Sequence, residues 1–235
     1  MNERPLPTRA QAAVHAAKVQ AHRLRRGVWD RWITPTPRWG AGERPAGWRC
    51  VAESRSALRG AQDPSERALE AGKIHNLRLA AQAFDGVFVP PGRSVSFWAQ
   101  LGRPTVRRGF AVGREIRQGC LIPSVGGGLC QLSNALYDAA LTAGLPVPER
   151  HAHSQVVPGS LAETGRDATV FWNYVDLRLR APEGLWISCR LTADHLVVRY
   201  HAPAAAKRRS APALHVLRPR PSAGGWPGAR SQPPG

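Results

Sequence analysis

The nine residues from Gly126 to Asn134, GGGLCQLSN, constrain the fold of this chain more than any other stretch. Three consecutive glycines disfavour a helix, because glycine loses more backbone freedom on ordering than any other residue. Directly after them, apolar residues recur at helical spacing up to Ala143, and Gly144 suits the position that ends a helix. We therefore expect a glycine-rich loop that leads into a helix, with Cys130 in the first turn.

Cys130 is the best candidate nucleophile in the chain. At the start of a helix, unpaired N–H groups and the positive end of the helix dipole favour a thiolate over a thiol. Two alternatives stay open. In the first alternative, Cys130 is simply a small core residue, since cysteine is often buried. In the second the glycines cradle a phosphate, although the sequence has no P-loop pattern and no lysine near the loop.

Basic residues concentrate at the two ends of the chain, which carries a formal net charge of +17 over 235 residues. Residues 1–50 hold ten Lys and Arg against three acidic residues, and residues 203–235 hold six against none. The centre, 51–202, is nearly balanced, with seventeen against thirteen. This distribution argues against nucleic-acid binding by the core.

The four cysteines are widely spaced and form no CxxC pair, so we expect no zinc site, no other metal and no cofactor. No apolar run is long enough to span a membrane, and no apolar segment follows the basic residues near the N-terminus. The sequence thus predicts a cytoplasmic protein. The oligomeric state is not readable from it.

Helical and strand patterns alternate along the chain. Helical spacing is found at 10–33, in a basic amphipathic pattern, and at 63–84, which begins with the start signal Asp63-Pro64-Ser65-Glu66. Strand candidates are 87–89, 94–98, 112–116, 120–125, 167–172, 177–179, 185–189 and 196–200. We expect a single α+β domain in which an antiparallel or mixed sheet packs on the helix that carries Cys130.

Three regions follow from these patterns. Residues 1–50 form a basic, partly helical extension that packs on the domain or contacts a membrane surface, packing being the safer interpretation. Residues 51–202 form the α+β domain. Residues 203–235 are rich in Pro, Ala, Arg and Gly, and we expect them to be disordered.

The reactive residue types occur in the order cysteine, histidine, aspartate. Cys130 is followed by His151 and His153, and then by Asp167. A cysteine nucleophile needs an imidazole to take and return its proton, and the imidazole needs a carboxylate or amide to hold its tautomer. We therefore assign Cys130 as nucleophile, His153 as base and Asp167 as its orienting group, although a structural role for either histidine stays open. The same order is found in papain-like and transglutaminase-like hydrolases, an analogy of arrangement only.

Several blocks of the sequence resemble the VanW family over about residues 70–180. The most distinctive are Gly126–Ser133, Glu149–Ser154 and Gly165–Val170, with shorter matches at His75–Leu77, Pro91-Gly92, Ser96-Phe97 and Gly109-Phe110. The resemblance implies a bacterial protein linked to the cell envelope and to vancomycin-resistance gene clusters. It supplies no reaction, because the biochemical function of that family is unsettled.

Two hypotheses follow. The first is a cysteine-dependent acyl transferase or amidohydrolase that acts on peptidoglycan-like peptides, with N–H groups around Gly128–Gln131 as the oxyanion site. The second is a non-catalytic module that binds a cell-wall peptide or another small anionic ligand with the glycine loop and the helix N-terminus. The residues expected to bind the ligand are Gly126, Gly127, Gly128, Gln131, Ser133, His151, Ser154 and Arg166.

Overall fold

The computed structural model describes residues 17, 20–21, 24, 26–28, 36–58, 66–117, 120–153, 161–172 and 174–204. The predicted disordered tail lies outside these residues except for its first two, and so do Asp63–Ser65 of the predicted helix start and the candidate ligand residue Ser154. The described residues at 17–28 are helical, in agreement with the pattern of the N-terminal extension.

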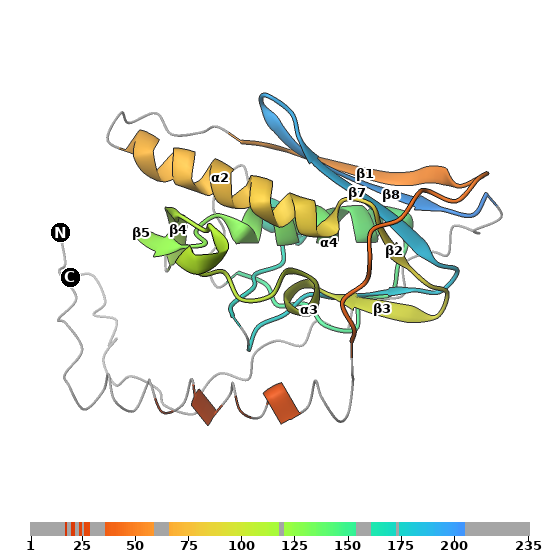
Figure 1. The fold of residues 1–235 in the computed structure, drawn as a ribbon, viewed down its shortest axis with the longest axis horizontal. Coiled ribbons are helices and arrows are strands. Elements are labelled where there is room, and N and C mark those ends of the chain that lie inside the picture. The colour runs from red at the N-terminus through yellow and green to blue at the C-terminus, as the bar shows by residue number, and fades with distance from the viewer. Residues whose placement is uncertain are drawn as a thin grey trace, which may run out of the picture.

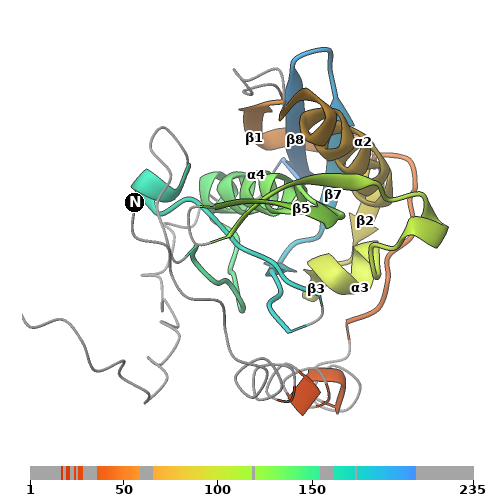
Figure 2. The ribbon, with the colours of Figure 1, turned by 90° about the vertical axis from the view of Figure 1, so that its left-hand side faces the viewer.

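Helices and antiparallel strands make up one α+β domain, as the sequence predicts (Figure 1). Its main sheet has the strand order β1-β8-β7-β2, formed by Arg49–Ala57, His195–Ala202, Leu185–Leu191 and Val87–Val89. Two further pairs lie outside this sheet: β3 (Arg93–Ser96) with β6 (Arg178–Ala181), and β4 (Val112–Arg117) with β5 (Cys120–Val125). The four-stranded sheet lies on one side of the long helices, and β3 with α3 (Phe97–Leu101) lies on the other (Figures 1 and 2).

The two long helices bury their apolar stripes between these layers. Helix α2 (Arg67–Phe84) contacts β7, and α4 (Leu129–Ala143) contacts β1 and β8. Leu132 and Leu136 of α4 are almost fully buried, as the helical spacing predicts. The Tyr200 hydroxyl of β8 donates to the Leu136 carbonyl at 2.8 Å, which fixes α4 on the sheet.

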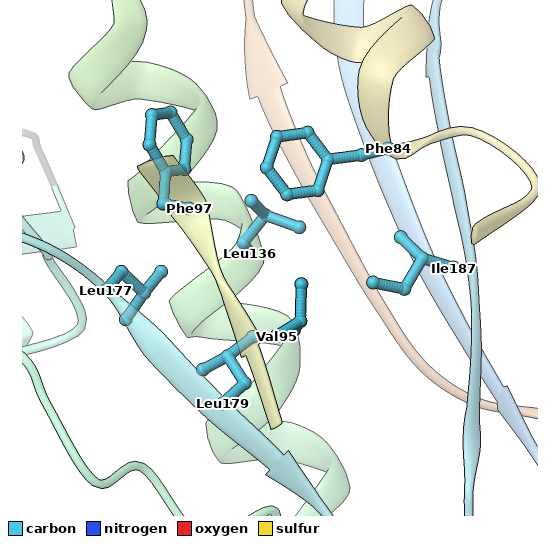
Figure 3. Close-up of a pocket in the computed structure, with 7 residues that line it drawn as sticks. All are labelled: Phe84, Val95, Phe97, Leu136, Leu177, Leu179 and Ile187. Atoms are coloured by element: carbon cyan, nitrogen blue, oxygen red, sulfur yellow. The ribbon is translucent and has the colours of Figure 1, made fainter. Parts of the chain in front are cut away.

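A small cavity remains in the core between α2, α4, the main sheet and the β3–β6 pair (Figure 3). Its lining is entirely apolar: Phe84, Val95, Phe97, Leu136, Leu177, Leu179 and Ile187. A cavity with these walls offers no polar group to orient a polar substrate, so it belongs to the packing of the core.

Three details of the element prediction are wrong or incomplete. The predicted strand at 94–98 stops at Ser96, because the Ser96 hydroxyl accepts a hydrogen bond from the Ala99 N–H and starts helix α3. The predicted strand at 167–172 has no regular structure, and single hydrogen bonds hold this segment instead. Strand β1, which pairs with β8 at the edge of the main sheet, was not predicted.

Candidate functional site

The glycine loop and helix α4 have the predicted geometry. Gly126 and Gly128 both have positive φ, Gly128 is the N-cap residue, and Cys130 is the second residue of the helix. The first N–H groups of a helix have no partner within it. The N–H groups of Gly126, Gly127 and Gln131 are already paired with backbone carbonyls. Among the residues that the structure describes, the N–H groups of Gly128, Leu129 and Cys130 therefore remain as donors for an oxyanion.

Two of the loop glycines have no room for a Cβ atom. A Cβ atom on Gly127 would lie 2.3 Å from the Gly113 carbonyl oxygen, and one on Gly128 would lie 2.3 Å from Cγ of Lys73. The buried Asn76 side chain donates to the Gly127 carbonyl at 3.0 Å and bonds both backbone polar groups of Ala111. The loop is thus fixed to α2 and β4, and the role of Asn76 is structural.

The fold also brings a lysine to this loop, which the sequence alone does not reveal. Lys73 of α2 packs its aliphatic stem against Gly128. Burial lowers the pKa of Lys73, opposed by the charge of Glu70. No lysine is near the loop along the sequence, but Lys73 lies next to it in the folded protein.

Cys130, His153 and Asp167 lie together. The Asp167 carboxylate oxygen Oδ2 is 2.6 Å from Nδ1 of His153 and accepts the backbone N–H of His153 at 2.7 Å. This contact leaves Nε2 as the ring nitrogen available to the nearby Cys130 side chain. The hydrogen bond with Asp167, followed by that with Cys130, raises the pKa of His153 to about 9 against the opposing effect of burial.

Arg150 holds the aspartate from the opposite side, and the sequence analysis did not identify this residue. Its Nη2 donates to Oδ1 of Asp167 at 2.7 Å and its Nε donates to the Asp167 carbonyl, also at 2.7 Å. Its guanidinium lies 5.1 Å from the ring centroid of Tyr137, within range of a cation–π contact. Burial disfavours the charged form of Asp167, but the hydrogen bonds from His153 and the charge of Arg150 outweigh it and lower the pKa of Asp167 to about 2.

Cys130 is partly exposed, and its sulfur lies close to two further groups. The sulfur of Cys130 is 3.7 Å from the Thr169 hydroxyl oxygen and 3.8 Å from the Val170 carbonyl oxygen. The His153 side chain keeps 26% of its surface accessible, whereas that of Asp167 keeps 3%. The site therefore has a reachable thiol and imidazole backed by a buried carboxylate.

The two histidines have different partners. His151 Nε2 lies 3.3 Å from a carboxylate oxygen of Glu149, and its carbonyl accepts the Thr169 N–H. The imidazole that meets the thiol belongs to His153.

The remaining candidate ligand residues are bound within the fold. The Gln131 amide donates to the Ser56 hydroxyl and the Ala57 carbonyl, which ties the end of β1 to the start of α4. The fully buried Ser133 hydroxyl lies 2.5 Å from the Ala168 carbonyl oxygen. Arg166 pairs with Asp138 and donates to the Thr142 hydroxyl. These contacts support the walls of the site, and ligand binding by these residues stays a prediction.

No helix among the residues that the structure describes combines the length and apolar character needed to cross a bilayer. No solved structure matches the chain.

Known sequences do match. Uncharacterized protein YoaR of Bacillus subtilis (strain 168) is 39% identical over 108 residues, which are 46% of this chain and 35% of YoaR. Vancomycin B-type resistance protein VanW of Enterococcus faecalis (strain ATCC 700802 / V583) is 34% identical over 113 residues, 46% of this chain and 40% of that protein. The matches thus span well under half of either relative.

A family model described as VanW like protein matches residues 72–201. This stretch contains Cys130, His153 and Asp167 and covers more than half of the chain, so the protein belongs to the VanW family.

Proposed function

We propose that this protein is a cysteine-dependent acyl transferase or amidohydrolase. The observation that carries the proposal is that Asp167, His153 and Cys130 lie together: a buried carboxylate holds the imidazole at 2.6 Å, and the imidazole is close enough to a thiol at a helix start for that thiol to raise its pKa. Nucleophile, base and orienting group in mutual contact are the arrangement that activates a cysteine.

The chemistry follows from these contacts. The Cys130 thiol transfers its proton to Nε2 of His153, and the thiolate forms a C–S bond with the carbonyl carbon of an amide. N–H groups of Gly128, Leu129 and Cys130 stabilise the oxyanion of the tetrahedral intermediate. The imidazolium then gives its proton to the amine as the C–N bond breaks, leaving a thioester on Cys130. Water or an acceptor amine, deprotonated by His153, attacks the thioester and restores the thiol.

The substrate class is the less direct part of the proposal. A peptide of the peptidoglycan type agrees with family membership and with the resistance-associated name of the relative from Enterococcus faecalis. If the chain works in the cytoplasm, the location expected from its sequence, such peptides are precursors rather than assembled wall.

A covalent adduct tests the proposal. The protein is incubated with peptidoglycan stem peptides, quenched with acid and digested, and Cys130 is examined by mass spectrometry for a mass increase equal to the acyl group. The adduct is expected on the wild type, in reduced amount on His153→Ala, and on no other cysteine. An adduct that survives in Cys130→Ala would place the reaction elsewhere and contradict the assignment.

The second candidate is the non-catalytic binding module. The contacts of the sulfur with Thr169 and Val170 favour it, since a packed thiol makes such contacts. Isothermal titration with the same peptides separates the two. Binding that persists in Cys130→Ala without any adduct in the wild type is the result expected for a binder.

A further inference from the structure

A second charged cluster lies at Glu149, the first residue of the segment 149–153 that ends at His153. Arg26, from the N-terminal extension, donates from Nη1 and Nη2 to the two oxygens of Glu149 at 2.5 and 2.8 Å. Nη2 also donates to Oδ2 of Asp176 at 3.0 Å. The Arg26 side chain is only 12% exposed and that of Asp176 only 2%. A bidentate contact of this kind is selective for a planar guanidinium.

The remaining contacts show that the two carboxylates need this cation. Arg178 Nε lies 3.3 Å from Glu149 and 3.3 Å from Asp176, so two arginines face two carboxylates. Among the described residues, the other polar contacts of Asp176 are with neutral donors, the Ser96 hydroxyl and the N–H groups of Trp98 and Leu177. Loss of Arg26 would take a cationic partner from two largely buried carboxylates, and removing one partner from such a group is strongly unfavourable.

The cluster is linked to the candidate site through a short stretch of backbone. Glu149 contacts His151 through its side chain and accepts the Arg178 N–H through its carbonyl at 2.9 Å. The next residue, Arg150, holds Asp167, and His153 follows three residues later. The position of Glu149 therefore sets where the segment 149–153 enters the site.

We propose that Glu149 and Asp176 form a guanidinium-binding site, filled by Arg26, and that its occupancy positions the segment that carries His153. Arg26 is in this view a positioning residue, because it acts on the imidazole through Glu149. Residue 26 precedes the stretch matched by the family model, 72–201, so the proposal extends the functional unit into the N-terminal extension. Only the effect on Cys130 rests on the proposed function.

The test is chemical rescue of Arg26→Ala by free guanidinium. Arg180→Ala serves as a matched control, because Arg180 is exposed and lies on β6 two residues beyond Arg178. Each protein is measured with about 10 mM guanidinium chloride or sodium chloride, a concentration far below the molar range in which guanidinium denatures proteins. The readouts are the thermal midpoint and the rate of Cys130 alkylation by iodoacetamide.

Arg26→Ala is expected to lower the thermal midpoint by roughly 5–10 °C and the alkylation rate by roughly three- to tenfold. Guanidinium should restore part of both in Arg26→Ala and change neither in the wild type or in Arg180→Ala. If Arg26→Ala does not fold, Arg26→Lys is compared with the wild type and with Arg180→Ala without added guanidinium, and it should show part of the same losses, since lysine keeps the charge but not the paired donors.

Each of the other outcomes contradicts one part of the proposal: the binding site, the positioning role or the proposed function on which that role rests. A variant at position 26 that behaves like Arg180→Ala, or a folded Arg26→Ala that guanidinium does not restore, overturns the binding site. Recovery of the thermal midpoint with no change in alkylation rate at any step overturns the positioning role. If Cys130 of the wild type is itself unreactive, the proposed function fails, and the thermal midpoints alone still decide the guanidinium site.

Discussion

Two clusters of acidic and basic residues flank the segment 149–153, and they differ in what faces the carboxylate. Asp167 faces Arg150 on one oxygen and a histidine on the other, and that histidine reaches a thiol. Asp176 faces two arginines and neutral donors. Arginine does not lose its proton in proteins, whereas histidine exchanges one near neutral pH. Similar residue types thus build a cluster with an ionisable imidazole in one place and a fixed ion-pair cluster in the other.

Exposure strengthens this difference. The Asp167 cluster presents a histidine whose side chain is 26% accessible, while Glu149, Asp176 and the two arginines keep between 2% and 16%. A reacting group must meet its substrate, whereas a structural ion pair gains from exclusion of water only if it is fully paired.

The sharpest separation of the two clusters comes from exchanging each histidine for alanine. His153→Ala should lower the rate of Cys130 alkylation at pH 6 by roughly 100-fold, because an unassisted thiol with a pKa near 8.5 is well under about 1% ionised there. His151→Ala is the matched control, since it lies two residues away and contacts Glu149 instead. We expect a change below about twofold for this control. Stopped-flow alkylation with quantification of each cysteine by mass spectrometry measures both rates.

Equal effects of the two substitutions on Cys130 would remove the distinction between the clusters. A large effect of His151→Ala alone would move the base to the other histidine.

A second comparison uses the free energy of unfolding. Asp176→Asn should lower it by about 2 kcal/mol, because two buried arginines lose a charged partner while the neutral donors keep an acceptor. The rate of Cys130 alkylation should fall far less than in His153→Ala, because no described contact joins Asp176 to Cys130, His153 or Asp167, and Asp176 acts on the imidazole only through Arg26 and Glu149. Urea denaturation and alkylation across pH 5–10 provide the two numbers. A fall in the alkylation rate as large as in His153→Ala, without loss of stability, is the contrary result.

The smallest expected effect is the dependence of stability on alkaline pH. The pKa of His153 rises from 6.5 to about 9 in the folded protein, so its contribution is complete below pH 6.5 and is lost as the pH rises through 9. Because the side chain is partly exposed, we expect a loss on the order of 1 kcal/mol between pH 6.5 and 9.5. The loss should shrink in Asp167→Asn, which removes the main cause of the raised pKa, and persist in Asp176→Asn. Urea denaturation at both pH values checks this, and an unchanged slope in Asp167→Asn would contradict it.

The sequence was informative where local pattern decides structure. The apolar period from Leu129 to Ala143 and the glycines around it predicted α4, and the alternating stretches predicted β4 to β8. It failed at Phe97 and Trp98, whose strand-like pattern was overridden by the helix cap at Ser96. Strand β1 was missed, because its partner β8 is nearly 150 residues away along the chain.

For the candidate site, the order of residues along the chain predicted which residue types take part, but it could not predict which side chains contact one another. That His153 rather than His151 meets Cys130 depends on how the segment 149–153 lies on α4. The clamp by Arg150 and the approach of Lys73 to Gly128 depend on tertiary packing in the same way. Arg150 was within reach of inference, since it lies in the Glu149–Ser154 block, but no spacing rule says which carboxylate it pairs with.

The most direct test of the central claim is the rate of Cys130 alkylation by iodoacetamide in the native wild type from pH 5 to pH 10. Cys50, which is exposed, and Cys189, which is buried, are internal references in the same digest. An imidazole-activated thiolate predicts that Cys130 reacts faster than both at pH 6 and that its rate changes little up to pH 8. A Cys130 that is slower than Cys50 at pH 6, with a rate that rises about tenfold per pH unit up to about pH 8.5, would contradict the assignment of Cys130, His153 and Asp167.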